Sequence, residues 1–335
     1  MEKVLFIRFS SIGDIVLTTP LLRVLKQQRP ETEIHYLTKK SFQAILLENP
    51  YITKIHSLEG GLAAVLEELK NEDFDFVIDL HRSLRSRVVK ARLQKPSATF
   101  AKLNRAKWLL VNTKINILPN IHIVDRYFNA LKKFNVKNDG KGLDYFLPEH
   151  TGEKVEQSLP ETIEKETYLL VVTGSKHKTK QIPKDKTARI CNEAGLPVVL
   201  AGSAEDRQGA EDIMQQLTVP AFNSCGLFDI NESAWLVKQS RVVLSPDTGL
   251  MHIAAAFQKP LITMWGNTVP AFGMYPYYPL SKQDYYRIHE VRKLHCRPCS
   301  KLGFERCPQG HFRCMNEIPD HEVVSSIRQL AEFYK

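Results

Sequence analysis

The stretch VLFIRFSSIGDIVLTTPLLRVLK, residues 4–26, decides the fold class of this 335-residue chain. It opens on the apolar run Val4–Ile7, which polar residues bound on both sides, as in a buried parallel strand. Small residues follow as far as Gly13, and from Asp14 onward apolar residues recur at helical spacing. The stretch therefore predicts a strand, a tight turn and a helix, which is the repeating unit of a parallel α/β fold.

Strand and helix patterns alternate along the rest of the chain. Short apolar runs predict strands at 34–37, 52–55, 74–78, 168–172, 197–201, 241–244 and 260–265. Periodic runs predict helices at 40–48, 62–71, 84–93, 184–194 and 205–217, and further helices that begin at Thr248 and Asp320. The polar stretch 148–166 contains two prolines and reads as a linker.

Two α/β halves joined by a linker are the plan of the GT-B fold, in which two Rossmann-like parallel-sheet domains face a cleft. We expect domains at 1–150 and 165–319, with a cysteine-rich loop at 295–315, and a C-terminal helix at 320–335. Ligands of such sheets bind outside the carboxyl ends of the strands, so the site is expected in the interdomain cleft.

Composition points to an anionic partner. The net charge is +9 and the pI is near 9.1, but the basic residues are scattered, without the block typical of a nucleic-acid tail. A solvated basic surface with no specific partner is the alternative. No apolar run is long enough to span a bilayer, and the short run after Lys3 does not make a signal peptide. We therefore expect a cytoplasmic protein with no nucleic-acid partner.

Asp14 is the first candidate for chemistry, because it places a carboxylate at the carboxyl end of a strand. The surrounding turn lacks the three-glycine spacing of a dinucleotide site, and no Gly-Lys-Ser/Thr of a P-loop follows. The alternative is that Asp14 only caps its helix.

Three more strand ends carry polar groups. Free amides at Thr248, Gly249 and Leu250 are suited to a diphosphate at a helix start. The lysine-rich loop 174–183 also suits a phosphate, and the Glu205 carboxylate could accept two ribose hydroxyls. Capped helices and a solvated basic loop are the alternatives at these places.

Taken together, these motifs resemble the family 9 glycosyltransferases, the ADP-heptose:lipopolysaccharide heptosyltransferases. The resemblance covers nearly the whole chain and is carried by SSIGDIVLTTPLLRVLK from Ser10, DLHRSLRS at 79–86 and DTGLMHIAAAFQKPLITMWGNTVP from Asp247. It implies an inverting enzyme that moves a heptose from ADP-heptose to the inner core of lipopolysaccharide. A peripheral contact with the inner membrane and a monomeric state also belong to this expectation.

The resemblance also implies roles for individual residues. Asp14 matches the general base. Residues of the C-terminal domain would bind the donor nucleotide sugar: Lys180, Thr179, Glu205, Asp247, Thr248, Gly249 and Leu250. Residues of the N-terminal domain would line the acceptor side: Ser10, Gly13, Arg82 and Arg85.

Some positions depart from the family pattern and leave the donor sugar open. Gln181 and Ile182 stand where the family often has an arginine and a tryptophan, and Pro246 replaces a frequent asparagine. A GT-B transferase that uses another nucleotide sugar and a nucleotide-sugar epimerase on the same fold are therefore alternatives. A basic binding protein without enzymatic activity is a third.

Four of the six cysteines lie in the C-terminal loop, as Cys296, Cys299, Cys307 and Cys314. Their spacing is compatible with four thiolates around a structural zinc ion, although it is not that of a common zinc ribbon. The alternative is a set of reduced or disulfide-paired cysteines that hold the loop. We expect a structural role in either case, since the reaction implied by the resemblance needs no catalytic metal.

Overall fold

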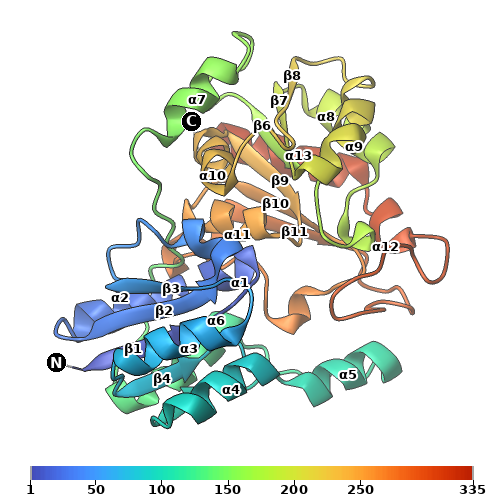
Figure 1. Ribbon diagram of the computed structural model, residues 1–335. Helices are drawn as coiled ribbons and strands as arrows, with labels where there is room; N and C mark the ends of the chain where they lie inside the picture. The colour runs from blue at the N-terminus through green and yellow to red at the C-terminus, as the bar shows by residue number, and fades with distance from the viewer. Residues whose placement is uncertain (1, 334–335) are drawn as a thin grey trace. The chain divides into compact units, whose positions relative to one another are not determined.

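The computed structural model describes residues 2–333, which divide into two compact units (Figure 1). The first comprises residues up to 102 together with 121–148, and the second comprises 103–120 together with 149 onward. Residues 103–120 thus belong to the second unit, whereas the sequence analysis placed them in the first domain. This helical segment precedes residues 121–148 of the first unit in the chain, but it makes its contacts with the C-terminal half.

The first unit is a five-stranded parallel sheet with strand order β3-β2-β1-β4-β5. Its strands are β1 (Lys3–Ile7), β2 (Glu33–Lys39), β3 (Lys54–Leu58), β4 (Phe76–Asp79) and β5 (Ser97–Thr99). Its helices are α1 (Ile12–Val16), α2 (Thr19–Gln28), α3 (Leu62–Asn71), α4 (Leu84–Leu93) and α6 (Ile123–Phe128), with 3₁₀ helices η1 (Lys40–Ile45) and η2 (Asn129–Phe134). Apolar faces of β1, α3 and α4 meet in one buried cluster on the sheet.

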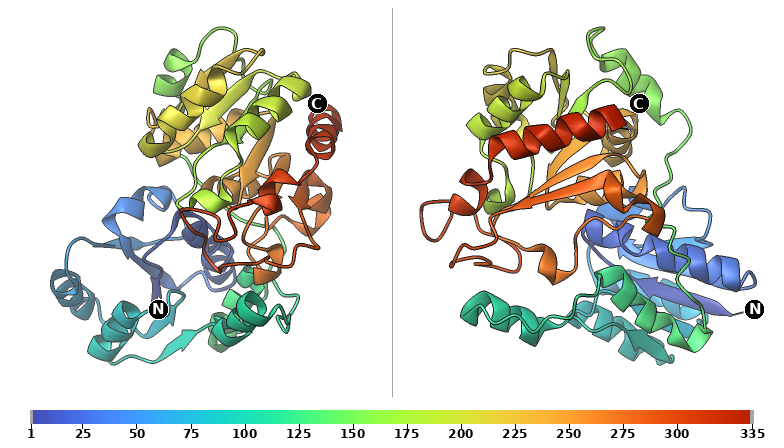
Figure 2. Two further views of the ribbon diagram at one scale, coloured as in Figure 1. Left: turned by 90° about the vertical axis from the view of Figure 1, so that its right-hand side faces the viewer. Right: turned by 180° about the vertical axis from the view of Figure 1, so that it is seen from behind.

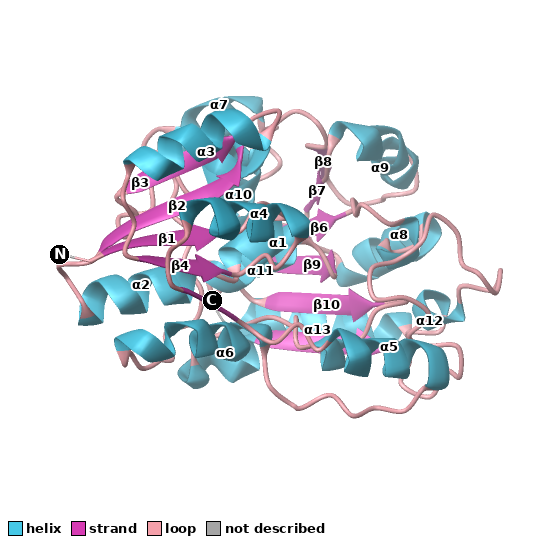
Figure 3. Cartoon of the chain, turned by 60° about the horizontal axis from the view of Figure 1, so that its bottom comes forward, coloured by secondary structure: helices cyan, strands magenta, loops and turns pink. Residues whose placement is uncertain are grey.

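The second unit is a six-stranded parallel sheet with strand order β11-β10-β9-β6-β7-β8 (Figure 3). Its strands are β6 (Leu169–Val172), β7 (Val198–Ala201), β8 (Ala221–Asn223), β9 (Val242–Pro246), β10 (Leu261–Trp265) and β11 (Tyr286–Glu290). Its α-helices are α5 (Asn104–Thr113), α7 (Thr151–Ser158), α8 (Lys184–Ala194), α9 (Arg207–Met214), α10 (Ile230–Gln239), α11 (Gly249–Ala256), α12 (Arg313–Asn316) and α13 (Asp320–Phe333). Its 3₁₀ helices are η3 (Lys178–Lys180), η4 (Ala204–Asp206), η5 (Pro270–Phe272) and η6 (Leu280–Tyr285).

The C-terminal helix α13 is part of the second unit's core. It crosses the back of the sheet (Figure 2), and its buried Val323, Ile327 and Leu330 pack into the same apolar cluster as α8 and the strands. The amphipathic spacing that predicts the helix thus also explains where it packs.

Several elements differ from the sequence-based expectation. Residues 40–48 contain a short 3₁₀ helix in place of an α-helix, and the strand expected at 52–55 begins two residues later. The linker region contains α7, whose single buried residue, Val155, left little periodic signal. The first helix is broken in two because Pro20, near the start of α2, has no amide to continue the ladder of α1. Within the described residues, no helix has the length and apolarity that crossing a bilayer requires.

Candidate active site

In the first unit, Asp14 lies in the first turn of α1, which the turn of residues 8–11 connects to the carboxyl end of β1. The Ser11 amide and hydroxyl donate to Asp14 Oδ2 over 3.2 and 2.9 Å, so the side chain does cap the helix, as the simpler reading expected. The other oxygen, Oδ1, lies 2.5 Å from Nη2 of Arg8. Because the Asp14 side chain is still 20% exposed, capping leaves part of the carboxylate open to solvent.

Arg8 determines the charge state of Asp14. Burial alone raises the pKa of this carboxyl group, but the Arg8 charge and the Ser11 hydrogen bonds outweigh burial and hold the pKa below its ordinary value. Arg8 is itself held by the carbonyl oxygens of Leu80 and Ser10, because β1 and β4 are neighbours in the sheet. Asp14 is therefore a fixed, ionised carboxylate at neutral pH, which is the form that a general base requires.

His81, which follows β4, is a candidate site residue that the sequence reasoning missed. Its Nδ1 is buried and has no hydrogen-bond partner in the part of the chain that the structure describes. Burial and the charges of Arg8 and Lys102 lower the pKa of His81 to about 4, so the ring is neutral. A buried polar atom without a partner suggests a ligand group. The sequence hinted at His81 only through its place in the DLHRSLRS stretch, which does not mark the histidine itself.

The remaining acceptor-side candidates lie on the same edge of the sheet. Asp79 accepts the amides of His81 and Arg82 and so shapes the turn before α4. Arg82 is exposed and donates to the carbonyl of Phe100, and Arg85 is exposed on the first turn of α4. Ser10 is half-buried in the β1–α1 turn, and Gly13 is buried in the first turn of α1.

In the second unit, the loops after β6, β9 and β10 meet because β9 lies between β6 and β10 in the sheet. Lys180 Nζ lies 2.6 Å from Asp247 Oδ2, and the Thr268 hydroxyl donates to the same oxygen over 2.9 Å. The three residues come from η3, the end of β9 and the loop after β10. The Lys180 and Asp247 side chains are 16% and 14% exposed, so a ligand at the surface could reach both.

The start of α11 adjoins this cluster. Thr248 is the N-cap residue in extended conformation, and its hydroxyl lies 3.1 Å from that of Ser245. Gly249 and Leu250 are half-buried in the first turn, where helix amides lack intrahelical acceptors. The structure thus brings Lys180, Asp247, Thr248, Gly249 and Leu250 to one edge of the sheet, where an anion would meet both a lysine and a helix N-terminus.

Asn267 is a second residue that the sequence reasoning missed. It lies two residues beyond β10 and beside Thr268, its side chain is 1% exposed, and both of its polar atoms lack a hydrogen-bond partner within residues 2–333. An unsatisfied buried amide next to the Lys180–Asp247 cluster suggests a donor-binding role. Only its place inside the quoted WGNTVP string hinted at it.

Thr179 does not present its hydroxyl to this cluster. It is 3% exposed, and its amide and hydroxyl both bond to the backbone of Phe304. Its role is therefore to tie the cysteine-rich loop to η3. Arg297 makes a second tie, by donating to the carbonyl oxygens of Gly266 and Thr268 while pairing with Glu290. The loop 295–315 thus supports the two segments that carry Lys180 and Thr268.

Glu205 lies on η4, at the carboxyl end of β7, and its side chain is exposed. Its neighbour Asp206 makes the closer approach to the loop after β6, because it accepts from Gln181 over 3.3 Å and lies against Gly174. A Cβ on Gly174 would come within 2.1 Å of Asp206 Oδ2, so a larger residue there would displace the Asp206 carboxylate. Asp206 is thus a second carboxylate at the position where the sequence analysis singled out Glu205 alone.

The four loop cysteines are free thiols that influence one another. Burial, followed by the charges of neighbouring cysteines, raises the pKa of Cys299, and similar effects raise the pKa of Cys314 to about 12. Cys296 Sγ lies 3.9 Å from His311 Nε2. Among the described residues, however, no three ligand atoms of this loop lie within 4.8 Å of one another. The thiols are gathered, but they do not form a closed metal site.

A separate pocket of about 460 Å³ lies in the second unit between α5 and the segment 290–298. Lys114 and Arg297 line it, but Lys114 donates to the carbonyl oxygens of Val111 and Pro298, and Arg297 is occupied as described above. None of the donor-site residues lines this pocket, so we base no role on its size.

The chain is similar to known proteins in both sequence and fold. The chain is 26% identical over 292 residues to lipopolysaccharide heptosyltransferase 1 of Campylobacter coli, which covers 79% of this chain and 84% of the relative. Its fold is similar to a family 9 glycosyltransferase of Veillonella parvula, with a TM-score of 0.79, 19% identity and coverage of 99% and 98% of the two chains. It is also similar to the ADP-heptose heptosyltransferase II of Escherichia coli, with a TM-score of 0.74, 19% identity and coverage of 99% of both chains.

The two parallel-sheet units and these neighbours confirm the predicted GT-B fold. The sequence profile of glycosyltransferase family 9 (heptosyltransferase) matches residues 62–302, well over half of the chain. The chain belongs to glycosyltransferase family 9, the heptosyltransferase family.

Proposed function

We propose that this enzyme is an inverting glycosyltransferase that moves a heptose from ADP-heptose to the inner core of lipopolysaccharide. The observation that carries the proposal is the cluster of Lys180, Asp247 and Thr268 at the N-terminus of α11, in a chain of the heptosyltransferase family. A sugar diphosphate can be bound by a cation, a carboxylate, a hydroxyl and free helix amides, and this cluster provides all four.

Donor binding would begin by exchange of ion pairs. In the free protein Asp247 neutralises Lys180. A diphosphate offers Lys180 a stronger partner, and the released Asp247 carboxylate can then accept hydroxyls of the sugar. The amides of Thr248, Gly249 and Leu250 would hold the phosphate oxygens as charge develops on the departing ADP. Glu205 and Asp206 would accept hydrogen bonds from the ribose hydroxyls. The side-chain amide of Asn267 would form hydrogen bonds with the bound donor.

Asp14 would act as the general base that takes the proton from the acceptor hydroxyl. One such residue suffices, because a nucleoside diphosphate leaves without being protonated, unlike the leaving group of a glycoside hydrolase. Attack opposite the leaving group inverts the anomeric carbon. Ser10, Gly13 and His81 would lie on the acceptor side, and the reaction needs no catalytic cofactor.

The acceptor is proposed to be anionic, with recruitment by Arg82, Arg85 and neighbouring basic side chains. The enzyme would work in the cytoplasm, at the inner membrane surface. Exposed Trp108, Ile115 and Ile117, on α5 and just after it, are suited to a peripheral lipid contact.

Activity on the lipid-linked acceptor is expected to fall as salt is added, because ions screen exposed charges with a Debye length of about 8 Å at physiological ionic strength. The measurement is the initial rate against sodium chloride concentration at saturating donor. A neutral sugar acceptor is the control, since its rate should change little. Equal salt responses for the two acceptors would contradict electrostatic recruitment.

The cysteine-rich loop is proposed to take a structural zinc ion through Cys296, Cys299, Cys307 and Cys314. The clustering of four free thiols supports this, while the spread of the ligand atoms means that the loop would have to contract around the metal. Because Arg297 and Phe304 tie the loop to the donor site, the metal would stabilise that site without taking part in the reaction.

Protein purified without a metal-affinity tag is expected to carry about one equivalent of zinc that resists dialysis and is lost in Cys299→Ser, since a structural site needs all four ligands. Elemental analysis measures the metal, with Cys191→Ser as the control at a buried cysteine outside the loop. Zinc far below one equivalent in the parent protein would rule the site out.

The decisive experiment is mass spectrometry of reactions that combine a panel of nucleotide sugars with truncated lipopolysaccharide cores. The proposal expects a mass increase of one heptose only with ADP-heptose and a core acceptor. Transfer from a UDP or GDP sugar would favour a different GT-B transferase. Conversion of the donor without an acceptor would favour an epimerase, and binding without turnover would favour a non-enzymatic protein.

A further inference from the structure

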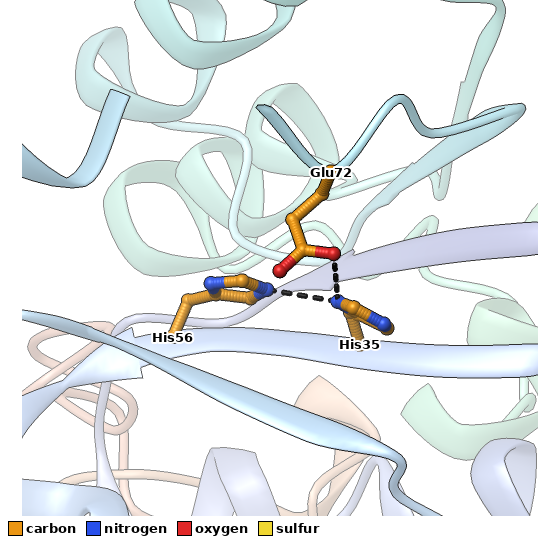
Figure 4. A group of neighbouring side chains, drawn as sticks. All are labelled: His35, His56 and Glu72. Carbon is orange, nitrogen blue, oxygen red and sulfur yellow. Dashed lines mark hydrogen bonds and ion pairs between the residues drawn. The ribbon is translucent and has the colours of Figure 1, made fainter. Parts of the chain in front are cut away.

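Three metal-binding types of side chain converge in the first unit, away from Asp14. His35 comes from β2, His56 from the neighbouring strand β3, and Glu72 from the end of α3. Nδ1 of His35 lies 2.9 Å from Nε2 of His56 and 3.9 Å from Oε2 of Glu72, and the three ligand atoms all lie within 4.8 Å of one another. Figure 4 shows both rings and the carboxylate directed toward one place.

A fourth residue orients this group. Glu68 Oε1 lies 2.7 Å from Nδ1 of His56 and so fixes the ring proton there, which leaves the Nε2 lone pair facing His35. A carboxylate bonded to the remote nitrogen of a histidine is the usual outer support of a metal ligand in proteins. Both histidines are nearly inaccessible, with exposures of 3% and 0%, and their burial favours the neutral imidazole that a metal binds.

We propose that His35 Nδ1, His56 Nε2 and Glu72 Oε2 form a binding site for a divalent transition-metal cation, of which zinc is the best match. Two imidazoles and one carboxylate are a common ligand set for zinc, with water in the fourth position. The Glu72 side chain is 16% exposed, which leaves a route for that water. In the free protein His35 Nδ1 donates its proton to His56 Nε2, so metal binding requires that proton to move to His35 Nε2, the other neutral tautomer of the ring. Metal–nitrogen bonds of about 2.0–2.1 Å also require the two nitrogens to move apart to about 3.3 Å, a small shift.

The bound cation would be structural, because it would join β2, β3 and the end of α3, whereas Asp14 lies at the carboxyl edge of the sheet. It must compete with lysines for Glu72, since Lys3 Nζ lies 3.2 Å from Oε2 and Lys54 Nζ lies 2.5 Å from Oε1. Removing the Lys3 charge should therefore tighten metal binding, a result that a weak, nonspecific site would not give.

The test uses metal-free, full-length protein that carries Cys299→Ser, so that the proposed zinc site of the cysteine-rich loop does not contribute. This protein is titrated with Co²⁺, followed by its visible spectrum, and with Zn²⁺, followed by its melting temperature. Co²⁺ at this site is expected to give absorption without the thiolate charge-transfer band that the cysteine loop would produce. At about 100 times the dissociation constant, Zn²⁺ should raise the melting temperature by about 4 °C.

Variants assign the signal. His56→Gln and Glu72→Gln should each weaken binding at least about tenfold, consistent with the loss of one ligand. Lys3→Met should strengthen it, and His150→Gln, which alters an exposed histidine–glutamate pair, should leave it unchanged. Because Glu72 is partly exposed, Glu72→Gln tests the site even if His56→Gln fails to fold. Absence of a thiolate-free cobalt signal, or equal affinity in parent and Glu72→Gln proteins, would overturn the proposal.

Discussion

Asp14→Asn is expected to lower kcat by about 100- to 10,000-fold, the usual effect of losing a general base. The amide has nearly the shape of the carboxylate and can still accept from Ser11, but it cannot take a proton from the acceptor hydroxyl. Nucleotide affinity should remain unchanged, because Asp14 belongs to the acceptor side. The measurement is kcat for heptose transfer, accompanied by ADP affinity and melting temperature.

The control for this variant is Asp139→Asn. Asp139 also pairs with a buried arginine of the first unit, Arg23, over 2.8 Å, so both variants remove a carboxylate charge from a buried guanidinium. Each should cost about 1–2 kcal/mol of stability, because hydrogen bonds to the arginine remain. Only Asp14→Asn should reduce kcat. Retention of full activity by Asp14→Asn would refute the base role and favour the capping function alone.

Lys180→Met is expected to lower kcat by about 100- to 1,000-fold, the magnitude seen when one fixed electrostatic stabiliser of a transition state is removed. The lysine would neutralise charge that grows on the diphosphate as the glycosidic bond breaks, so kcat should fall more than ground-state affinity does. ADP should bind about tenfold more weakly, consistent with one lost charge-assisted hydrogen bond. Calorimetry gives the affinity, and single-turnover kinetics give the rate.

Lys184→Met is the matched control, because Lys184 forms a comparable lysine–aspartate pair with Asp212 over 2.5 Å in the same unit. This exposed pair should contribute little to stability and nothing to catalysis. If Lys180→Met and Lys184→Met lose the same activity, the diphosphate-binding role of Lys180 is wrong.

The sequence predicted helix bounds closely where the apolar spacing and the residues at the helix ends indicated the same element. The structure confirms α3, α4 and α8 with the predicted bounds. Ser83 caps the start of α4, and Gly195 ends α8 in the left-handed conformation. The expected helix at 40–48 was wrong in type because only Ile45 of its 3₁₀ turn is buried. One buried side chain cannot distinguish a 3₁₀ turn from an α-helix, because the two periods separate only over several buried positions.

The candidate site was predictable only in part. Asp247 directly follows β9, whereas Asp14 and Lys180 lie in the turns that follow β1 and β6, and the ends of these strands are visible in the sequence. Arg8, His81 and Asn267 were not predicted. The sequence around the buried, unpaired nitrogens of His81 and Asn267 looks like that of ordinary core residues. Arg8 is equally inconspicuous, because its guanidinium bonds to the carbonyl oxygen of a residue 72 positions later in the chain.

The sequence alone determined the alternation of strands and helices, the fold class and the family resemblance, because these depend on periodicity and on short contiguous strings. Only the tertiary structure decided which strand ends are neighbours. Lys180 and Asp247 are 67 residues apart and meet because β9 pairs with β6 in the sheet. The same is true of His35, His56 and Glu72 in the first unit. Strand order is set by packing of the whole sheet, so no local stretch of sequence encodes these contacts.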